Sequence, residues 1–288
     1  MAREEIETGT RLGALSWNLF HGRDFPPDRA LLTLRSRLLR VSERDETHIQ
    51  VNRDLLDEFA GLIAGWDWEV ALLQECPPRW SERLARACDA ETHRSLTARN
   101  SMPFVRRCLG ALNPDLIASG EGGSNLLLVR EGAGPIRERR ELILQPGPRP
   151  ERRTMAFAQL EGGLCVAGLH ASVGIANRAA AEREVLAAAA AAAEWAEGSP
   201  LLFGGDFNLR PRDSNVFDEL AARFGMTAPN APGAIDHLLA SNMEVLEAAK
   251  ALPSDQRQVA DRSGLAIRLS DHAPVLARFR ASIPATAA

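Results

Sequence analysis

The sequence lacks the features that define several protein classes. Its four cysteines, Cys76, Cys88, Cys108 and Cys165, show no CxxC spacing, which argues against a zinc site or a disulfide framework. No strongly apolar stretch of about 18 or more residues occurs, so no transmembrane helix is predicted. The segment Met1–Arg11 is polar and has no apolar core, so we expect no signal peptide and a cytoplasmic location.

Tyrosine is absent, and Lys250 is the only lysine among 34 basic residues. We attribute both biases to the composition of the genome first and to function only second. The net charge of −4 disfavours strong, sequence-independent binding of a nucleic-acid duplex, although local basic patches remain open. An apolar fraction of 45% and a charged fraction of 25% are ordinary for a globular chain and exclude disordered, collagen-like and coiled-coil classes.

Short apolar runs alternate with helical patterns, without a repeat or a Gly/Ser linker. Continuous apolar runs are typical of strands that are buried on both faces. Glu161-Gly162-Gly163 between two of these runs predicts a hairpin turn. The predicted strands are Leu12–Asn18, Val70–Gln74, Ser124–Arg130, Thr154–Leu160, Leu164–His170, Pro200–Gly204, Ala234–Ala240 and Pro274–Phe279.

Three helices are predicted from apolar spacing and capping residues. The first lies in Val51–Ile63, the second runs from a cap at Asn177 to near Gly198, and the third starts at Asp213 or Ser214. Mixed hairpins and helices favour a layered α/β or α+β domain. We predict a single domain over residues 1–288, with its core at about 12–280 between short flexible termini.

Two segments rich in proline and arginine interrupt this pattern. Phe25–His48 is predicted to be a loop insertion with a short helix, and Gly132–Arg152 an exposed connection. Charged clusters such as Arg152-Arg153 are predicted to be solvated. Trp17 and the other tryptophans are predicted to fill the core or an interface.

Acidic, amide and imidazole side chains occur at the ends of the apolar runs. One such residue is ordinarily a turn former. Several at successive strand ends indicate a shared site, because strands deliver such side chains to one rim of a sheet. These residues are Asn18, Glu75, His170, Asp206, Asn208, Asp236, Asp271 and His272.

This combination fits metal-assisted hydrolysis of a phosphoester. A hard divalent cation prefers oxygen ligands, which Glu75 would supply with help from Asn18 or Asp271. A metal that bridges a phosphoryl oxygen neutralises charge as the transition state forms.

The remaining residues fit proton transfer and phosphate binding. Asp206 can orient or deprotonate the attacking water. His272 can donate to the phosphate if Asp236 holds its tautomer and raises its pKa. Gly204 and Gly205 are expected to allow a tight turn and a close approach to substrate.

The motifs that contain these residues occur in one order from Leu15 to Phe279. They are Trp17-Asn18, Leu73-Gln74-Glu75, Leu169-His170, Gly205-Asp206-Phe207-Asn208, Ile235-Asp236-His237 and Ser270-Asp271-His272-Ala273-Pro274. In this the chain resembles the endonuclease/exonuclease/phosphatase superfamily, which includes the DNase I-like nucleases.

The resemblance implies an α/β (α+β) fold, a four-layer αββα sandwich of two mixed β-sheets flanked by helices, with the site at one rim. It also implies Mg²⁺ or Mn²⁺ as the cofactor. Glu75 would be the principal metal ligand, with Asn18 and Asp271 nearby.

The resemblance also implies catalytic roles. Asp206 would position the water, with Asn208 beside it holding the phosphate. His170 would contact phosphate oxygens or assist the leaving group, and Asp236 would pair with His272. His237, which follows Asp236 on the same strand, should face the opposite way and be structural.

Two departures from the family pattern disfavour an abasic-site repair nuclease. Phe20 stands where those enzymes carry an acidic residue, and no tyrosine is present near the phosphate. Asn100 or Asn125 are the candidates to replace that tyrosine. His21 and Arg23 either line the site as substrate contacts or belong to a solvated loop.

The sequence therefore predicts a Mg²⁺/Mn²⁺-dependent phosphodiesterase or nuclease. Alternatives are a phospholipid-type phosphodiesterase or a small-molecule phosphatase of the same superfamily, and then a catalytically silent scaffold. The expected partner is a phosphodiester substrate, with nucleic acid open. No membrane and no obligate protein partner are predicted.

Overall fold

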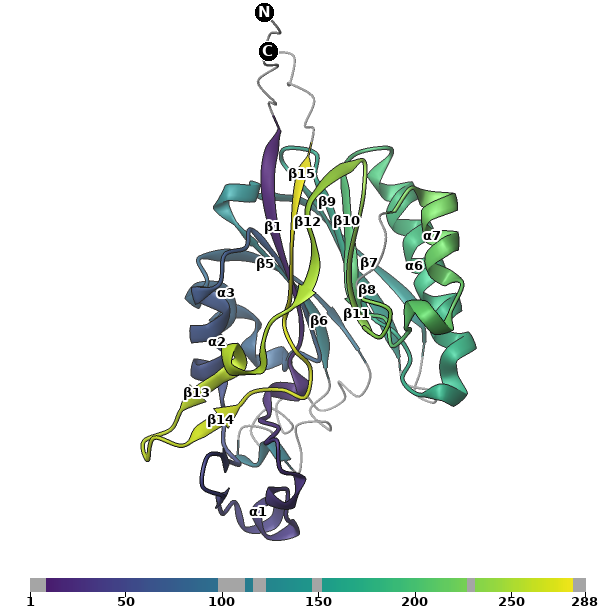
Figure 1. Ribbon diagram of the computed structural model, residues 1–288. Coiled ribbons are helices and arrows are strands. Elements are labelled where there is room, and N and C mark those ends of the chain that lie inside the picture. Colours follow the sequence, from purple (N-terminus) through teal and green to yellow (C-terminus); the bar gives the residue numbers. More distant parts are fainter. Residues whose placement is uncertain (1–8, 98–111, 116–122, 147–151, 227–230, 282–288) are drawn as a thin grey trace, which may run out of the picture.

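Two β-sheets form the centre of the molecule (Figure 1). The computed structural model describes residues 9–97, 112–115, 123–146, 152–226 and 231–281. The six strands of the first sheet are, in spatial order, β12 (Met243–Ala251), β15 (Val275–Ala281), β1 (Thr10–Asn18), β4 (Val70–Gln74), β6 (Ser124–Arg130) and β5 (Ala90–Leu96).

The second sheet has five strands, and both sheets are mixed. β1 and β4 are parallel in the first sheet, and β9 and β10 are parallel in the second, whereas the other pairs are antiparallel. The order in the second sheet is β11 (Asp236–Ser241), β10 (Leu201–Asp206), β9 (Cys165–His170), β8 (Arg153–Leu160) and β7 (Ile136–Gln145). The predicted Glu161–Gly163 turn connects β8 and β9.

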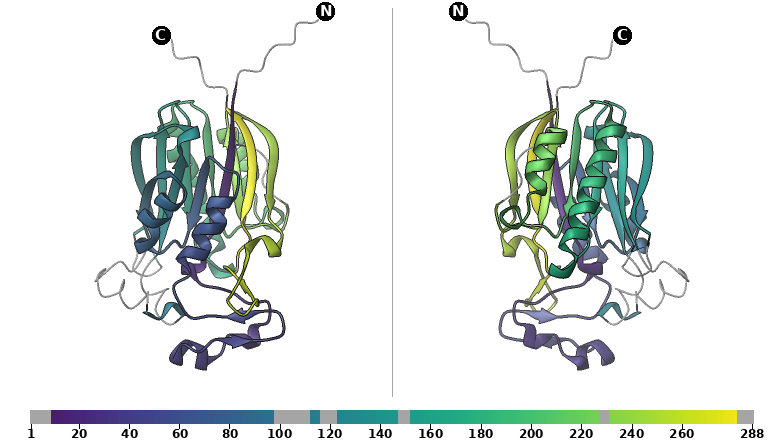
Figure 2. Two further views of the ribbon diagram at one scale, coloured as in Figure 1. Left: turned by 90° about the vertical axis from the view of Figure 1, so that its left-hand side faces the viewer. Right: turned by 90° about the vertical axis from the view of Figure 1, so that its right-hand side faces the viewer.

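Helices cover both outer faces of the sheet pair, as the two views of Figure 2 show. Helices α2 (Leu56–Gly65) and α3 (Ser81–Ala87) pack on the first sheet, and α6 (Arg178–Ala196) and α7 (Val216–Phe224) pack on the second. A third apolar layer lies between the sheets. The chain therefore has the expected αββα sandwich.

The apolar layers reflect the alternation of side chains along each strand. On β1, Trp17 packs with Phe59 of α2, with ring centroids 4.9 Å apart, while Ala14 faces the space between the sheets. On β10, Phe203 packs in the apolar layer under α6 and α7, and Leu202 faces the other sheet. Central strands therefore bury both faces, which explains their continuous apolar runs.

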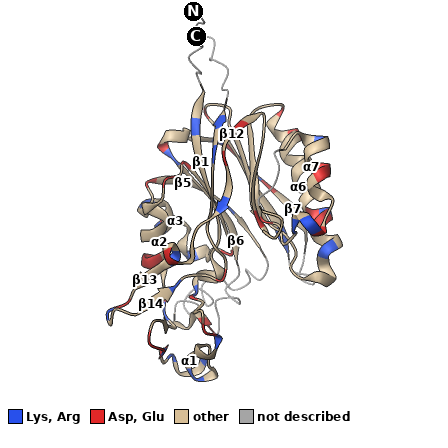
Figure 3. Cartoon of the chain, in the orientation of Figure 1, with Lys and Arg blue, Asp and Glu red and all other residues tan. Residues whose placement is uncertain are grey.

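In the two large sheets three strands escaped prediction, and all three lie at sheet edges. The expectation that Gly132–Arg152 is an exposed connection was wrong, because Ile136–Gln145 within it forms β7, which pairs with β8. β5 and β12 form the two edges of the first sheet. Edge strands carry charges that discourage pairing with other chains, so they lack an apolar run. Figure 3 shows charged residues along such outer segments.

The Phe25–His48 insertion contains the expected short helix, α1 (Leu34–Leu39). The insertion also contains a 3-10 helix (Arg29–Leu31) and β2 (Glu43–Arg44), which pairs with β3 (Ile49–Gln50) just after it. A second small sheet pairs β13 (Gln258–Ala260) with β14 (Ala266–Arg268). Both extend from the sandwich at the end where α1 lies (Figure 1).

The predicted helix starts were accurate to a few residues. α6 begins after Asn177, but the Asn177 amide donates to the carbonyl of Val173 and does not cap the helix. At α7, the Ser214 hydroxyl accepts from the backbone N–H of Val216. No helix in the described ranges combines the length and the hydropathy that a membrane span requires.

Candidate active site

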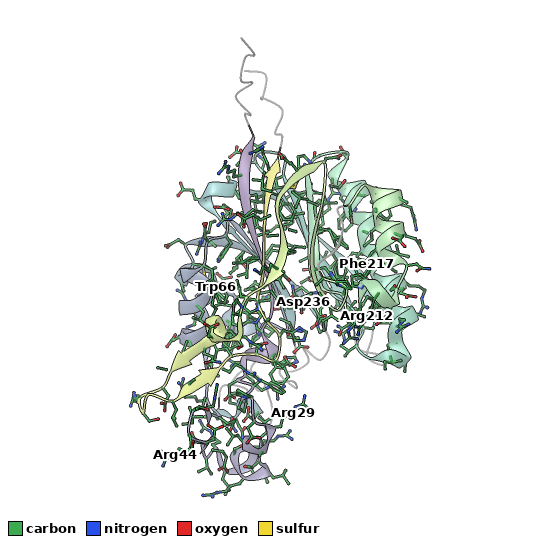
Figure 4. The ribbon with its side chains drawn as sticks, viewed as in Figure 1. Arg29, Arg44, Trp66, Arg212, Phe217 and Asp236 are labelled. Carbon is green, nitrogen blue, oxygen red and sulfur yellow. The ribbon has the colours of Figure 1, made fainter. Side chains whose placement is uncertain are left out.

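The polar residues predicted at the strand ends converge on one rim of the sandwich. Strand register places the end of β1, at Asn18, beside the end of β4, directly before Glu75. In the second sheet, Asp206 lies beside His170 on one side and Asp236 on the other. Figure 4 labels Asp236 at this end of the sheets. Residues far apart in the sequence therefore form one site.

Asp206 is the hub of this site and is 1% exposed. Its Oδ2 accepts a hydrogen bond from the Asn18 amide at 3.0 Å. The Nε2 atoms of His170 and His272 lie 3.5 and 3.8 Å from the same oxygen. Its Oδ1 accepts from the backbone N–H of Asn208. One buried carboxylate thus contacts both histidines.

His272 and Asp236 form a hydrogen-bonded pair, with 2.9 Å between Nδ1 and Oδ2. Burial opposes protonation of His272, but the hydrogen bond and charge of Asp236 raise its pKa to about 10. His272 is therefore an imidazolium at neutral pH, with Nε2–H directed to Asp206. Burial and the charge of Asp236 raise the pKa of Asp206 to about 7.

His170 is the second, neutral imidazole of the site. Burial, and next the charge of Arg153, lower its pKa to about 3. Its Nδ1 lies 3.3 Å from the Arg153 guanidinium, which can only donate, so the ring proton resides on Nε2. The prediction that Arg153 is solvated was wrong, because this residue is 7% exposed at the start of β8.

Glu75 and Asp271 form the acidic side of the rim. Burial opposes ionisation of Glu75, but neighbouring histidines, first His21, lower its pKa. The Nε2 of His21 lies 3.2 Å from Oε2 of Glu75. Burial and the charge of Glu75 raise the pKa of Asp271, although the charge of His272 opposes this. The Arg23 guanidinium lies over the Phe20 ring, 3.8 Å from its centroid. Its charge also interacts with the carboxylates of Glu75 and Asp271.

Asn18 holds carboxylates through its amide nitrogen. Its oxygen accepts from the backbone N–H of Phe20 at 3.0 Å, and its nitrogen donates to Asp206 and interacts with Glu75. In this arrangement Asn18 positions the acidic groups, while its oxygen faces its own backbone.

Left-handed backbone conformations gather at the rim. Within the described ranges, five of the nine non-glycine residues with positive φ belong to the site, and such backbone is costly for side-chain-bearing residues. Strain of this kind is typical of functional positions. The five are Phe20, His21, Glu75, Asn208 and Ser270.

The paired glycines before Asp206 serve packing between strands. A Cβ on Gly205 would lie 2.0 Å from the carbonyl oxygen of Leu169, and one on Gly204 would lie 2.5 Å from that of His237. We expected these glycines to allow a close approach to substrate. The structure gives them a packing role instead, because without a Cβ they let β9, β10 and β11 approach one another.

Residues beyond the predicted set anchor the loop that carries His272. The indole of Trp17 donates to the His272 carbonyl at 3.0 Å. Arg257 donates to the carbonyls of Ser270 and His272. The Ser270 hydroxyl donates to the Asn18 carbonyl and accepts from the His272 N–H. No sequence pattern points to Arg257, which ends the short 3-10 helix Ser254–Arg257 before β13.

Glu184 of α6 anchors the loop after His170. Its carboxylate, 6% exposed, accepts from both the N–H and the hydroxyl of Ser172. The Asn208 amide donates to the neighbouring carbonyl of Ala171. An Ala-rich helix therefore contributes a positioning residue.

The other predicted residues lie in different surroundings. Asn125, 2% exposed, donates to the Thr154 carbonyl and ties the two sheets together. Asn100 lies outside the described residues. His237 is buried between Phe207 and Phe217 and contacts the Leu209 carbonyl, in agreement with its predicted structural role.

The family comparison matches residues 15–272 to a model described as the Endonuclease/Exonuclease/phosphatase family. The search of curated proteins returned no match. The matched range includes every rim residue from Asn18 to His272.

Solved structures with the same fold cover nearly all of the chain. An endonuclease/exonuclease/phosphatase family protein from Bacteroides thetaiotaomicron is 16% identical, with a TM-score of 0.61 over 95% of this chain and 98% of its own. A mannosyl-6-phosphatase from B. thetaiotaomicron VPI-5482 is 15% identical, with a TM-score of 0.59 over 93% and 99%. Truncated Caenorhabditis elegans TDP2 is 16% identical, with a TM-score of 0.53 over 94% and 98%.

Proposed function

The chain belongs to the endonuclease/exonuclease/phosphatase family, and we propose that it is a divalent-metal-dependent phosphodiesterase that cleaves by in-line attack of water. The observation that carries this proposal is the convergence of the His272–Asp236 pair, His170 and Glu75 around the buried Asp206. One side of the site is acidic and carries Glu75, and the other side carries the His272 imidazolium. A phosphoryl group held against a metal requires both kinds of charge.

Glu75 and Asp271 fit a hard divalent cation. They are adjacent carboxylates whose charges interact unfavourably, since Glu75 contributes to the raised pKa of Asp271. Mg²⁺ is commonly bound through one or two carboxylates and keeps several waters. We propose that these two residues hold Mg²⁺ or Mn²⁺ and that Asn18 positions Glu75. When bound, the ion would neutralise charge on phosphoryl oxygens.

A second cluster, formed by Asp206, Asp236 and His272, is less suited to bind a metal ion. The ligand atoms of Asp206, Asp236 and His272 lie within 4.8 Å of one another. His272 already supplies a positive charge there, because its pKa is raised to about 10. The imidazolium therefore fills the place that a cation would take in this cluster.

Asp206 is proposed to accept a proton from the attacking water. Its pKa of about 7 makes it a far better base than an ordinary aspartate while leaving much of it ionised at neutral pH. Asn208, which follows on a left-handed backbone, is proposed to hold the phosphate.

The two histidines are proposed to bind phosphoryl oxygens in different charge states. His272 donates from Nε2 as an imidazolium, with Asp236 fixing its orientation. His170 donates from Nε2 as a neutral ring, with Arg153 at its other nitrogen. A pKa of about 3 makes His170 a poor proton donor to a leaving group, so contact with phosphate oxygens is its proposed role. His21 and Arg23 remain proposed substrate contacts.

A phospholipid phosphodiesterase is the second candidate, because the insertion exposes leucines beside arginines. Leu34, Leu38 and Leu39 of α1 are 60–72% exposed, an apolar surface with Arg35 and Arg37 on the same helix. Arg29 and Arg44, which are labelled in Figure 4, lie in the same Phe25–His48 insertion. A small-molecule phosphatase is the third, since one structural neighbour is a mannosyl-6-phosphatase.

The proposal is tested with bis(p-nitrophenyl) phosphate and p-nitrophenyl phosphate, assayed side by side with Mg²⁺ or Mn²⁺. We expect release of nitrophenol from the diester, abolished by EDTA and by Glu75→Gln or His272→Ala. Glu219→Gln, at the surface of α7, is the matched control and should retain the full rate. Turnover of the monoester alone would favour the phosphatase, and unchanged rates in both site variants would refute the mechanism.

A further inference from the structure

A cavity of about 550 Å³ opens beside the catalytic pair. Asp236, Asp271 and His272 form one part of its wall. Eight of its thirteen lining residues are glycine, alanine, valine or isoleucine, so the wall is smooth and largely apolar. A volume of this size is typical of sites for nucleotide-sized ligands.

Two cationic side chains also border this cavity. Lys250 lies on β12, and Arg210 follows Asn208 in the loop after β10. Both are exposed, and within the described ranges neither side chain has an ion pair or a hydrogen bond. Several exposed arginines elsewhere are ion-paired, as Arg137 is with Glu161. Unpaired cations that border a cavity are available to a ligand.

Arg210 has a second distinguishing feature, because it also borders a smaller cavity of about 220 Å³ on the side of Asn208. Arg210 therefore lies between two cavities, one next to His272 and one next to Asn208. Lys250 is the only lysine in the chain. A lysine binds phosphate as a compact point charge, and an arginine binds it through a planar fork.

The distribution of charge divides this cavity into two ends, because Asp236, Asp271 and His272 line it on the side of the scissile phosphate. The catalytic end carries Asp206, Asp236, Asp271 and Glu75, which suits a metal-bound phosphoryl group. The cationic groups at the cavity lie outside that acidic cluster and need a different anion. A ligand that satisfies both ends carries two anionic groups.

We propose that this cavity is a substrate subsite in which Arg210 and Lys250 bind a second phosphate, so that the preferred substrate is a nucleotide-sized phosphoester with two anionic groups. The inference rests on the proposed function for the identity of the scissile group. The apolar wall would accommodate the sugar or base between the two phosphates. Arg210 and Lys250 are specificity residues in this scheme and take no part in bond cleavage.

The test compares thymidine 3′,5′-bisphosphate with thymidine 5′-monophosphate by calorimetric titration with Mg²⁺. An Asp206→Asn background prevents turnover of either probe. We expect the bisphosphate to bind about tenfold more tightly, as charge-assisted hydrogen bonds would provide. Arg210→Gln and Lys250→Gln should each lower that ratio at least threefold, with little change for the monophosphate. Arg223→Gln, on the outer surface of α7, is the matched control.

Hydrolysis of bis(p-nitrophenyl) phosphate separates the two proposals. Arg210→Gln and Lys250→Gln in the otherwise native chain should change its rate less than twofold, which also shows that both variants fold. Equal affinity for the two probes would overturn the subsite, even if the diester is hydrolysed. A preference for the bisphosphate that depends on both cations, in a chain that cleaves no diester, would support the subsite and count against the proposed function.

Discussion

The Nδ1 atom of His272 lies 2.9 Å from Oδ2 of Asp236, although 35 residues separate them in the sequence. β11 begins at Asp236, and His272 lies in the loop before β15, so the pair bridges the two sheets at the rim. The opposite ring nitrogen of His272 lies 3.8 Å from Asp206. One imidazole therefore connects two carboxylates, and the charge of Asp236 contributes to the raised pKa of Asp206.

Replacing Asp236 by asparagine should remove the main cause of the raised pKa of His272. That pKa should fall from about 10 toward its ordinary value of 6.5. We expect kcat/KM for a diester to fall about 100-fold or more at neutral pH. The deficit should widen as the pH rises from 6 to 9, since the imidazolium is then lost. A pH series of kcat/KM measures this, with Asp218→Asn as the surface control; parallel profiles would contradict the assignment.

The ionisation of Asp206 should set the acid limb of the activity profile. If Asp206 accepts the proton from water, kcat/KM should rise with pH to a plateau above a midpoint near 7. The Asp236→Asn change removes one cause of the raised pKa of Asp206, so the midpoint should shift to lower pH. An acid limb that does not move in Asp236→Asn would show that another group carries the proton.

Much of this site can be predicted from the sequence because its strands are central. β4 and β10 are buried on both faces, so each is a continuous apolar run, and a polar residue at its end is conspicuous. The common rim then follows from the geometry of layered sheets. The edge strand β7 could not be found this way, because its first residue is followed by five consecutive charged residues, Arg137–Glu141, which resemble a surface loop.

Residues that act through tertiary contacts could not be found either. The prediction that Arg153 is solvated rests on its neighbours in the sequence, because Arg152 and Glu151 indicate a solvated segment. Its burial beside His170 depends on the pairing of β8 with β9. Arg257 and Glu184 are further examples, since each contacts a loop from a different part of the chain. The extent of the domain beyond the described residues stays a prediction.

Gly205→Ala should destabilise the fold far more than another glycine replacement. Gly205 has φ of +130°, and its Cβ would meet the Leu169 carbonyl oxygen at 2.0 Å, so the strands must separate. We expect a loss of about 3 kcal/mol or more in the free energy of unfolding. Gly61→Ala, in α2 with open space around it, should instead stabilise by about 0.5–1 kcal/mol. Denaturant unfolding of both variants checks this, and a Gly205→Ala loss below about 1 kcal/mol would contradict it.

Arg153→Gln should alter the charge state of His170 while keeping an amide donor near its Nδ1. Burial and the charge of Arg153 lower the pKa of His170 to about 3, so removing the charge should raise that pKa. The folded pKa lies below the ordinary value of 6.5, so the unfolded state binds more protons as the pH falls below 6.5, and acid unfolding is favoured. Arg153→Gln should weaken this acid sensitivity and lower kcat/KM about tenfold, because the tautomer is no longer enforced.

The titration of His170 in Arg153→Gln is measured by NMR of the imidazole carbons, together with unfolding free energies between pH 4 and 7. Arg223→Gln, which removes an exposed arginine paired with Glu219 on α7, is the control. An ordinary structural role for Arg153 would lower stability equally at all pH values and leave the pKa of His170 near 3. A pH-dependent difference between the two variants is specific to the Arg153–His170 contact, because only there does the lost charge face a buried imidazole.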